Sequence, residues 1–203
     1  MVRKRLDDDR REELLDGLMG IISARGFSEM TISEMARELH CSGSSLYKIA
    51  SSKDSLVVLA IARWSKLTLE EMELSALRGT TAADRARSYW RAGAEAIRPL
   101  SPAFRSDVDR FESARLAYRT SISEPFIDRF VELLDHAAEA GEIEPTNTRF
   151  LAHVLRQIAF VVRDERILGE CGLTAAQAML EVDRFVWNGI LAPSARPLVS
   201  SKA

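Results

Sequence analysis

Polar side chains that could contact nucleic acid follow one another between residues 42 and 48. A lysine can donate to a phosphate oxygen or to guanine, and a serine hydroxyl can bond to any of several bases. Apolar residues at helical spacing would form the inner face of a short helix here: Leu46, Ile49 and Ala50. The outer face would then carry Ser44, Ser45, Tyr47 and Lys48. This pattern predicts a short helix whose polar face is open to solvent.

The residues before this helix predict a second helix packed against it. Thr31 is an N-cap candidate, and Glu34 stands at the capping-box spacing behind it. An apolar stripe follows: Ile32, Met35, Ala36 and Leu39. The turn His40–Ser42 comes next, and Ser42 can cap the second helix. Two helices joined in this way form a helix-turn-helix, whose second helix enters the DNA major groove. The same spacing is equally compatible with a corner of a helical bundle.

Catalytic and metal chemistries find little support elsewhere in the chain. The three histidines are scattered, and Glu132 with His136 is a single pair that lacks the second helix of a di-iron bundle. Neither Cys41 nor Cys171 has a second cysteine at metal spacing. Since there is also no glycine-rich phosphate loop or nucleophile elbow, we expect no enzyme and no cofactor or metal.

Composition favours a soluble helical protein. The 203 residues are 46% hydrophobic and 29% charged, and the net charge is -2, so there is no overall attraction to nucleic acid. Two cysteines are too few for a disulfide framework. The basic start of the chain is followed by Asp7–Asp9 rather than by an apolar segment, and the longest apolar run is only Leu56–Ala62. We therefore expect a cytoplasmic protein that does not enter a membrane.

Periodicity predicts an all-α fold, because nearly every stretch repeats at helical spacing. Gly26 should end the first helix as a C′ residue, and Ser51 with Asp54 should cap the fourth. Thr81 with Asp84 should cap the fifth. The expected helices span residues 9–25, 31–39, 43–49, 52–75, 81–98, 103–120, 126–139, 148–169 and 174–191.

The first quarter of the chain resembles the DNA-binding domain of the TetR (tetracycline repressor-like) transcriptional regulators. The matching residues are Ala24–Phe27, Met30–Ala36, Ser42, Leu46–Tyr47 and Ser52–Leu56. The resemblance implies a three-helix helix-turn-helix domain over residues 1–55. The helix at about 52–75 would link it to a helical ligand-sensing and dimerisation domain over 56–203. It also implies a homodimeric regulator, expected to be a repressor, that binds a palindromic double-stranded DNA operator and is released by a small-molecule effector.

The resemblance also assigns roles to residues. Tyr47 and Lys53 match phosphate-contacting positions, and the start of the second helix, with Thr31 and Ser33, would receive another phosphate. Ser44, Ser45 and Lys48 would face base edges, behind the cap at Ser42. The turn departs from the common Gly-Val-Ser pattern of the family. His40 replaces the glycine and is therefore expected at positive φ.

Two surfaces are expected in the C-terminal part. The last two long helices are apolar on more than one face, which favours a dimer interface through Leu151, Leu155, Ile158, Val182, Val186, Trp187 and Ile190. Both helices could equally be core helices of a monomer. An effector pocket could use Tyr89, Trp90, Phe104, Phe111, Tyr118, His153, Arg156, Gln157 and Phe160. At helical spacing such aromatic residues are more often part of the core.

Two other kinds of protein remain as alternatives. The short recognition face is compatible with a helical interaction module that has lost DNA binding. A helical-bundle enzyme would need a convergent acid–base or metal constellation in the C-terminal half.

Overall fold

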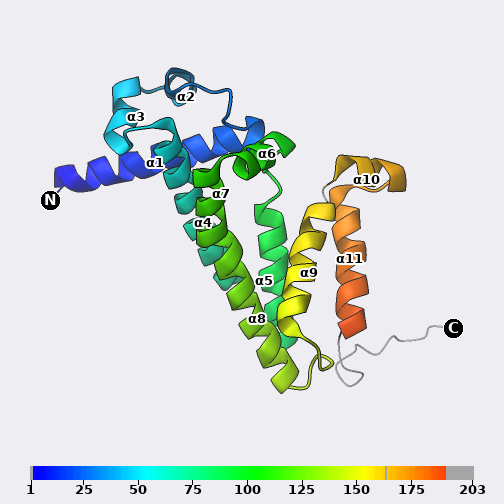
Figure 1. Cartoon of the computed structure of the whole chain (residues 1–203). Coiled ribbons are helices and arrows are strands. Elements are labelled where there is room, and N and C mark those ends of the chain that lie inside the picture. The colour runs from blue at the N-terminus through cyan, green and yellow to red at the C-terminus, as the bar shows by residue number, and fades with distance from the viewer. Residues whose placement is uncertain (1, 163, 191–203) are drawn as a thin grey trace. The chain divides into compact units, whose positions relative to one another are not determined.

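The computed structural model describes residues 2–162 and 164–190, and this part of the chain forms helices without β-strands (Figure 1). The helices are α1 Val2–Arg25, α2 Ile32–Glu38, α3 Gly43–Ile49, α4 Lys53–Ala76, α5 Ala82–Ala96, α6 Pro102–Arg110, α7 Glu112–Tyr118, the π-helical turn η1 Arg119–Ser123, α8 Glu124–Glu139, α9 Thr148–Val161, α10 Glu165–Cys171 and α11 Ala175–Ile190. The predicted all-α class is confirmed. No helix among the described residues is long and apolar enough to cross a membrane.

The chain divides into two compact units. The first contains Met1–Glu70 and Ile97–Pro125, and the second contains Glu71–Ala96 and Phe126–Ala203. Residues 97–125, which the sequence assigns to the C-terminal domain, therefore pack with α1–α3.

The core of the first unit explains why α6 and α7 belong to it. Phe27, in the loop after α1, is 3% exposed and packs against Phe104 of α6 and against Phe111. The ring centroids lie 6.2 and 5.5 Å from that of Phe27. The same core contains Leu18, Ile22, Met35, Leu46, Leu56, Leu100 and Val108. Burial of these apolar surfaces is the main force that assembles the unit.

Local signals set most helix boundaries of the first unit. Thr31 and Glu34 form the predicted capping box of α2, and Gly26 adopts a φ of 79° after α1. His40 has a φ of 49° in the turn before α3, as expected from its position. The predicted Ser51–Asp54 cap is wrong, because Ser52 accepts the Ser55 N–H at 3.1 Å and so caps α4 one residue later. Helix α1 also begins well before Asp9.

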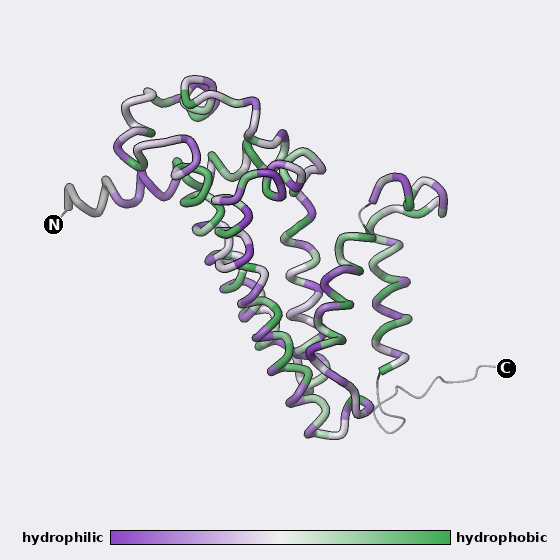
Figure 2. Tube along the Cα trace, in the orientation of Figure 1, coloured by the Kyte–Doolittle hydropathy of each residue, from purple (hydrophilic) through white to green (hydrophobic). Residues whose placement is uncertain are grey.

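The second unit has an aromatic core. Tyr89 and Trp90 of α5 are fully buried, and Tyr89 stacks on Phe126 and Phe130 of α8. The indole N–H of Trp90 donates to the carbonyl of Leu155 in α9 at 3.2 Å. Figure 2 shows hydrophobic and hydrophilic segments alternating along α8, which is the pattern of an amphipathic helix.

A carboxylate from the loop after α8 holds the start of α5. Glu142 accepts the N–H of Ala83 at 2.7 Å, while Thr81 caps the helix by accepting the N–H of Asp84 at 3.1 Å. Burial alone would raise the pKa of Glu142, but hydrogen bonds from Ala83 and Thr81 outweigh burial and lower it. The conformation of Gly141, with a φ of 68°, turns the chain so that Glu142 reaches α5.

Three predicted helix limits are wrong. The segment 103–120 is divided at Phe111, whose extended backbone ends α6 and precedes α7. The interruption expected between residues 120 and 126, before Pro125, is absent, because the π-helical turn η1 joins α7 directly to α8. The segment 148–169 forms two helices, since Asp164 accepts the N–H groups of Arg166 and Ile167 and starts α10. Residue 191, the predicted end of the last helix, lies outside the described residues.

Candidate nucleic-acid interface

Helices α2 and α3 are joined by a tight turn. Cys41 donates its N–H to the carbonyl of Ala36 at 2.9 Å, and the left-handed conformation of His40 reverses the chain between them. Leu46 of α3 is fully buried in the core with Met35 and Ala36 of α2. The inner face of α3 is thus fixed against α2, as a helix-turn-helix requires.

The opposite face of α3 is open. Tyr47 is 57% exposed, and Lys48 and Ser44 are also exposed. The Ser42 hydroxyl lies 2.8 Å from that of Ser44 and 2.9 Å from that of Ser45, and it also accepts the N–H of Ser45. The serines bond to one another, and Tyr47 and Lys48 are the large exposed side chains of α3.

The start of α2 carries a negative charge. Both the N–H and the hydroxyl of Thr31 donate to the Glu34 carboxylate at 2.8 Å. The hydrogen bond from the Thr31 backbone contributes most to lowering the pKa of Glu34, so this side chain stays ionised. Thr31 and Ser33 are exposed, as a phosphate contact would require, but Glu34 would oppose a phosphate beside Thr31.

Lys53, the other residue predicted to contact a phosphate, contacts the protein itself. Its ammonium group donates to the carbonyls of Phe27, Ser28 and Met30 at 3.1, 2.8 and 3.0 Å. Sequence reasoning missed this role, because the three acceptors are backbone atoms more than twenty residues away.

Asp107 of α6 holds the same loop and was also missed. Its Oδ2 accepts the N–H groups of Phe27 at 2.6 Å and Ser28 at 2.8 Å. Burial alone would raise the pKa of Asp107, but these hydrogen bonds outweigh burial and lower it. No local pattern signals the contact, since about eighty positions separate the partners.

The residues predicted to bind an effector are divided between the two units. Phe104, Phe111 and Tyr118 lie in the first unit, where Tyr118 stacks on Trp64 with centroids 6.0 Å apart. The second unit contains the others: buried Tyr89 and Trp90, half-buried Arg156 and Phe160, and exposed His153 and Gln157. Among residues 2–162 and 164–190, no acceptor bonds to the indole N–H of buried Trp187 in α11.

The residues predicted at a dimer interface are also divided, by burial. Leu155, Val186 and Trp187 are buried within the second unit, while Leu151, Ile158, Val182 and Ile190 are half-buried. Four other apolar side chains on the same two helices are more exposed than these and were not predicted: Phe150 and Val161 on α9, and Leu180 and Phe185 on α11. Phe185 is 80% exposed.

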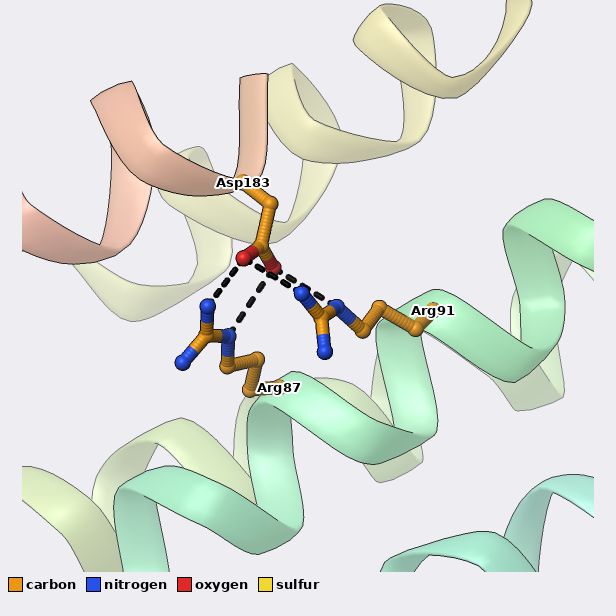
Figure 3. A network of polar contacts seen from close by, with 3 residues as sticks. All are labelled: Arg87, Arg91 and Asp183. Carbon is orange, nitrogen blue, oxygen red and sulfur yellow. Dashed lines mark hydrogen bonds and ion pairs between the residues drawn. The ribbon is translucent and has the colours of Figure 1, made fainter. Parts of the chain in front are cut away.

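A network that the sequence did not indicate connects α5 with α11 (Figure 3). Buried Asp183 accepts two hydrogen bonds from Arg87 and two from Arg91, which stand one helical turn apart. The hydrogen bonds to Asp183 raise the pKa of Arg87. Each carboxylate oxygen is satisfied twice, which offsets the cost of burying the charge. Among the described residues, no cluster of three or more His, Cys, Asp or Glu could hold a metal ion.

Proteins similar to this chain are found among solved structures. Neither a protein-family model nor a curated protein matches the chain. A protein from Saccharomonospora viridis, solved in complex with choline, is similar with a TM-score of 0.77 and 15% identity, over 91% of this chain and 98% of that one. A TetR-family transcriptional regulator from Agrobacterium tumefaciens gives 0.72 and 14%, over 92% and 100%. The ketosteroid transcriptional regulator KstR2 of Mycobacterium tuberculosis gives 0.66 and 20%, over 90% and 95%. The chain therefore has the fold of the TetR-family transcriptional regulators.

Proposed function

We propose that this protein is a transcriptional regulator of the TetR family that binds operator DNA through α2 and α3. The observation that carries the proposal is the two-sided character of α3. Leu46 is fully buried against α2, while Tyr47 and Lys48 extend into solvent from the other side. A helix of this kind can enter the major groove without disturbing its own core.

The regulator would act as a homodimer on a palindromic operator. A single short helix gives a small contact surface, and two such helices would engage half-sites about 34–36 Å apart. Four large exposed apolar side chains on α9 and α11 support this assembly, because a partner protomer could remove their surface from water: Phe150, Val161, Leu180 and Phe185. The half-buried residues predicted at the interface would flank them.

We also propose that the protein is a repressor and that a small-molecule effector weakens its binding to the operator. Two observations support an effector site. A protein of the same fold was solved with choline. The buried N–H of Trp187 has no acceptor in the part of the chain that the structure describes, and a buried donor is costly until an acceptor is supplied. The effector would therefore carry a hydrogen-bond acceptor, such as a carbonyl or carboxylate oxygen.

The DNA-binding proposal is tested by fluorescence anisotropy with duplexes from the DNA that flanks the protein's own gene. The wild type should bind one duplex at least about a thousandfold more tightly than unrelated DNA. Lys48→Ala should change the preference among operator variants, whereas Lys66→Ala, which alters an exposed lysine of α4, should not.

Equal affinity for all duplexes would contradict the proposal. It would favour the alternative of a helical interaction module that has lost specific DNA binding. We propose no catalytic role for the chain.

A further inference from the structure

The loop Gly26–Met30, which connects α1 to α2, is held by charged side chains from two later helices. Lys53, at the start of α4, donates to three of its carbonyls. Asp107, in α6, accepts two of its N–H groups. The positive group thus binds three carbonyls of the loop, and the negative group binds two of its N–H groups.

The donor capacity of Lys53 is fully used within the protein. An ammonium group has three N–H donors, and here three carbonyl oxygens lie within 3.1 Å of it. A DNA phosphate could bind this group only if a carbonyl gave up its hydrogen bond. Lys48 on α3, in contrast, is exposed.

Asp107 also lies very close to the backbone of the loop. The residue is 7% exposed, and Asp107 Oδ2 lies 2.6 Å from the place where a Cβ on Gly26 would be. A second anchor lies nearby, where Ser101 donates its N–H to the carbonyl of Ser23 in α1 at 2.8 Å. Ser101, just before α6, and Asp107, within α6, therefore both hold the chain where α1 ends.

We propose that Lys53 and Asp107 are positioning residues for DNA binding, which together fix the Gly26–Met30 loop and so the start of α2. Lys53 then makes no phosphate contact, in contrast to the role that the family resemblance implies. This inference rests on the proposed DNA-binding function of α2 and α3.

The salt dependence of operator binding separates positioning from phosphate contact. Each phosphate contact adds about 0.9 to the slope of log affinity against log salt concentration. Lys53→Met and Asp107→Ala should each lower operator affinity by about tenfold or more and leave the wild-type slope unchanged. Lys66→Met, which removes an exposed charge from α4, should change neither quantity. A slope that becomes shallower in Lys53→Met by about 0.9 for each protomer, or about 1.8 for the proposed dimer, would overturn the proposal.

Hydrogen exchange of the loop amides tests the inference without DNA. In the full-length protein, the amides of Phe27 and Ser28 should exchange at least about tenfold faster in Lys53→Met and in Asp107→Ala than in the wild type. Lys66→Met should leave them protected. Unchanged protection in both variants would overturn the inference. If the wild type binds no operator but these amides respond as expected, the proposed function fails while the positioning of the loop stands.

Lys53→Arg keeps the test decisive if Lys53→Met unfolds. A guanidinium preserves the charge and suits a phosphate, but its planar donors cannot converge on three carbonyls. The proposal predicts lower operator affinity and faster exchange of the loop amides in Lys53→Arg. Wild-type affinity together with unprotected loop amides would show that the charge, rather than the position of the loop, matters.

Discussion

Gly26 occupies a position where no other residue fits without strain. Its φ is 79°, and a Cβ would approach Asp107 Oδ2 to 2.6 Å and the carbonyl carbon of Ala103 to 3.3 Å. Both the backbone conformation and the close approach of α6 therefore require glycine here.

Gly26→Ala should lower the free energy of unfolding by about 2 kcal/mol or more, through backbone strain and displacement of Asp107. Gly20→Ala is the matched control, because nothing lies within 4 Å of its Cβ position and alanine favours a helix there. Urea denaturation of the two variants measures the difference. Equal stability of Gly26→Ala and the wild type would show that α6 does not constrain this turn.

Asp107 should give the protein a measurable loss of stability in acid. Its pKa is lower in the folded state than the ordinary value, so its contribution is complete above about pH 4 and disappears as the pH falls through the folded-state pKa. Asp107→Asn should be less stable than the wild type at pH 7, and the two should converge at low pH. Urea denaturation across this range tests it, with exposed Asp109→Asn as control. A constant difference at every pH would contradict the assignment.

At the scale of elements, the start of α2 depends on one reciprocal cap. Thr31→Ala should cost about 1 kcal/mol, because the N–H of Glu34 loses its acceptor and the N-cap hydroxyl is gone. Ser33→Ala, two residues away on the exposed side, should change stability by less than about 0.5 kcal/mol. Thermal unfolding of both variants distinguishes the cap from a general effect of removing a hydroxyl.

Elements with a strong local signal were predicted well. The Thr31–Glu34 box, the Ser42 cap and the amphipathic pattern of α8 depend on residues three or four positions apart, and the structure confirms them. The prediction failed where one apolar stripe continued through a break, since α9 and α10 are separated by a cap at Asp164 that hydrophobic periodicity does not reveal.

The contacts that organise the candidate site were beyond local reasoning. Lys53 was matched by family position, yet its acceptors are backbone oxygens, which have no signature in the sequence. Asp107 and the Asp183 network join residues about eighty or more positions apart. Only the fold brings these partners together, so a single sequence does not show them.

At the scale of the whole molecule, the nearly equal numbers of positive and negative residues bear on how the proposed dimer would bind DNA. Lys and Arg total 28 against 30 Asp and Glu, and Lys48 is the only basic residue of α3. If the protein binds DNA as proposed, attraction to phosphates alone would be weak, and simultaneous binding of the two protomers of the proposed dimer would supply most of the affinity.

Phe185→Glu should dissociate the proposed dimer, because it places a charge on the most exposed large apolar side chain of α11. Analytical ultracentrifugation should find monomers, and operator affinity should fall by about a hundredfold. Leu77→Glu, which changes a comparably exposed apolar side chain outside α9 and α11, is the control. A dimer that survives Phe185→Glu would place the interface elsewhere.

The division of the first unit into two stretches of chain has a consequence for synthesis. Phe104, Asp107 and Phe111 follow α5, so the ribosome makes a complete helix of the second unit before it supplies the residues that cover Phe27. A nascent chain that ends before residue 97 has α2 and α3 but leaves the Phe27 loop without Asp107. The first unit therefore completes its core only after residue 111 has been translated, and a chain that ended before residue 97 would lack the contacts that hold the Phe27 loop.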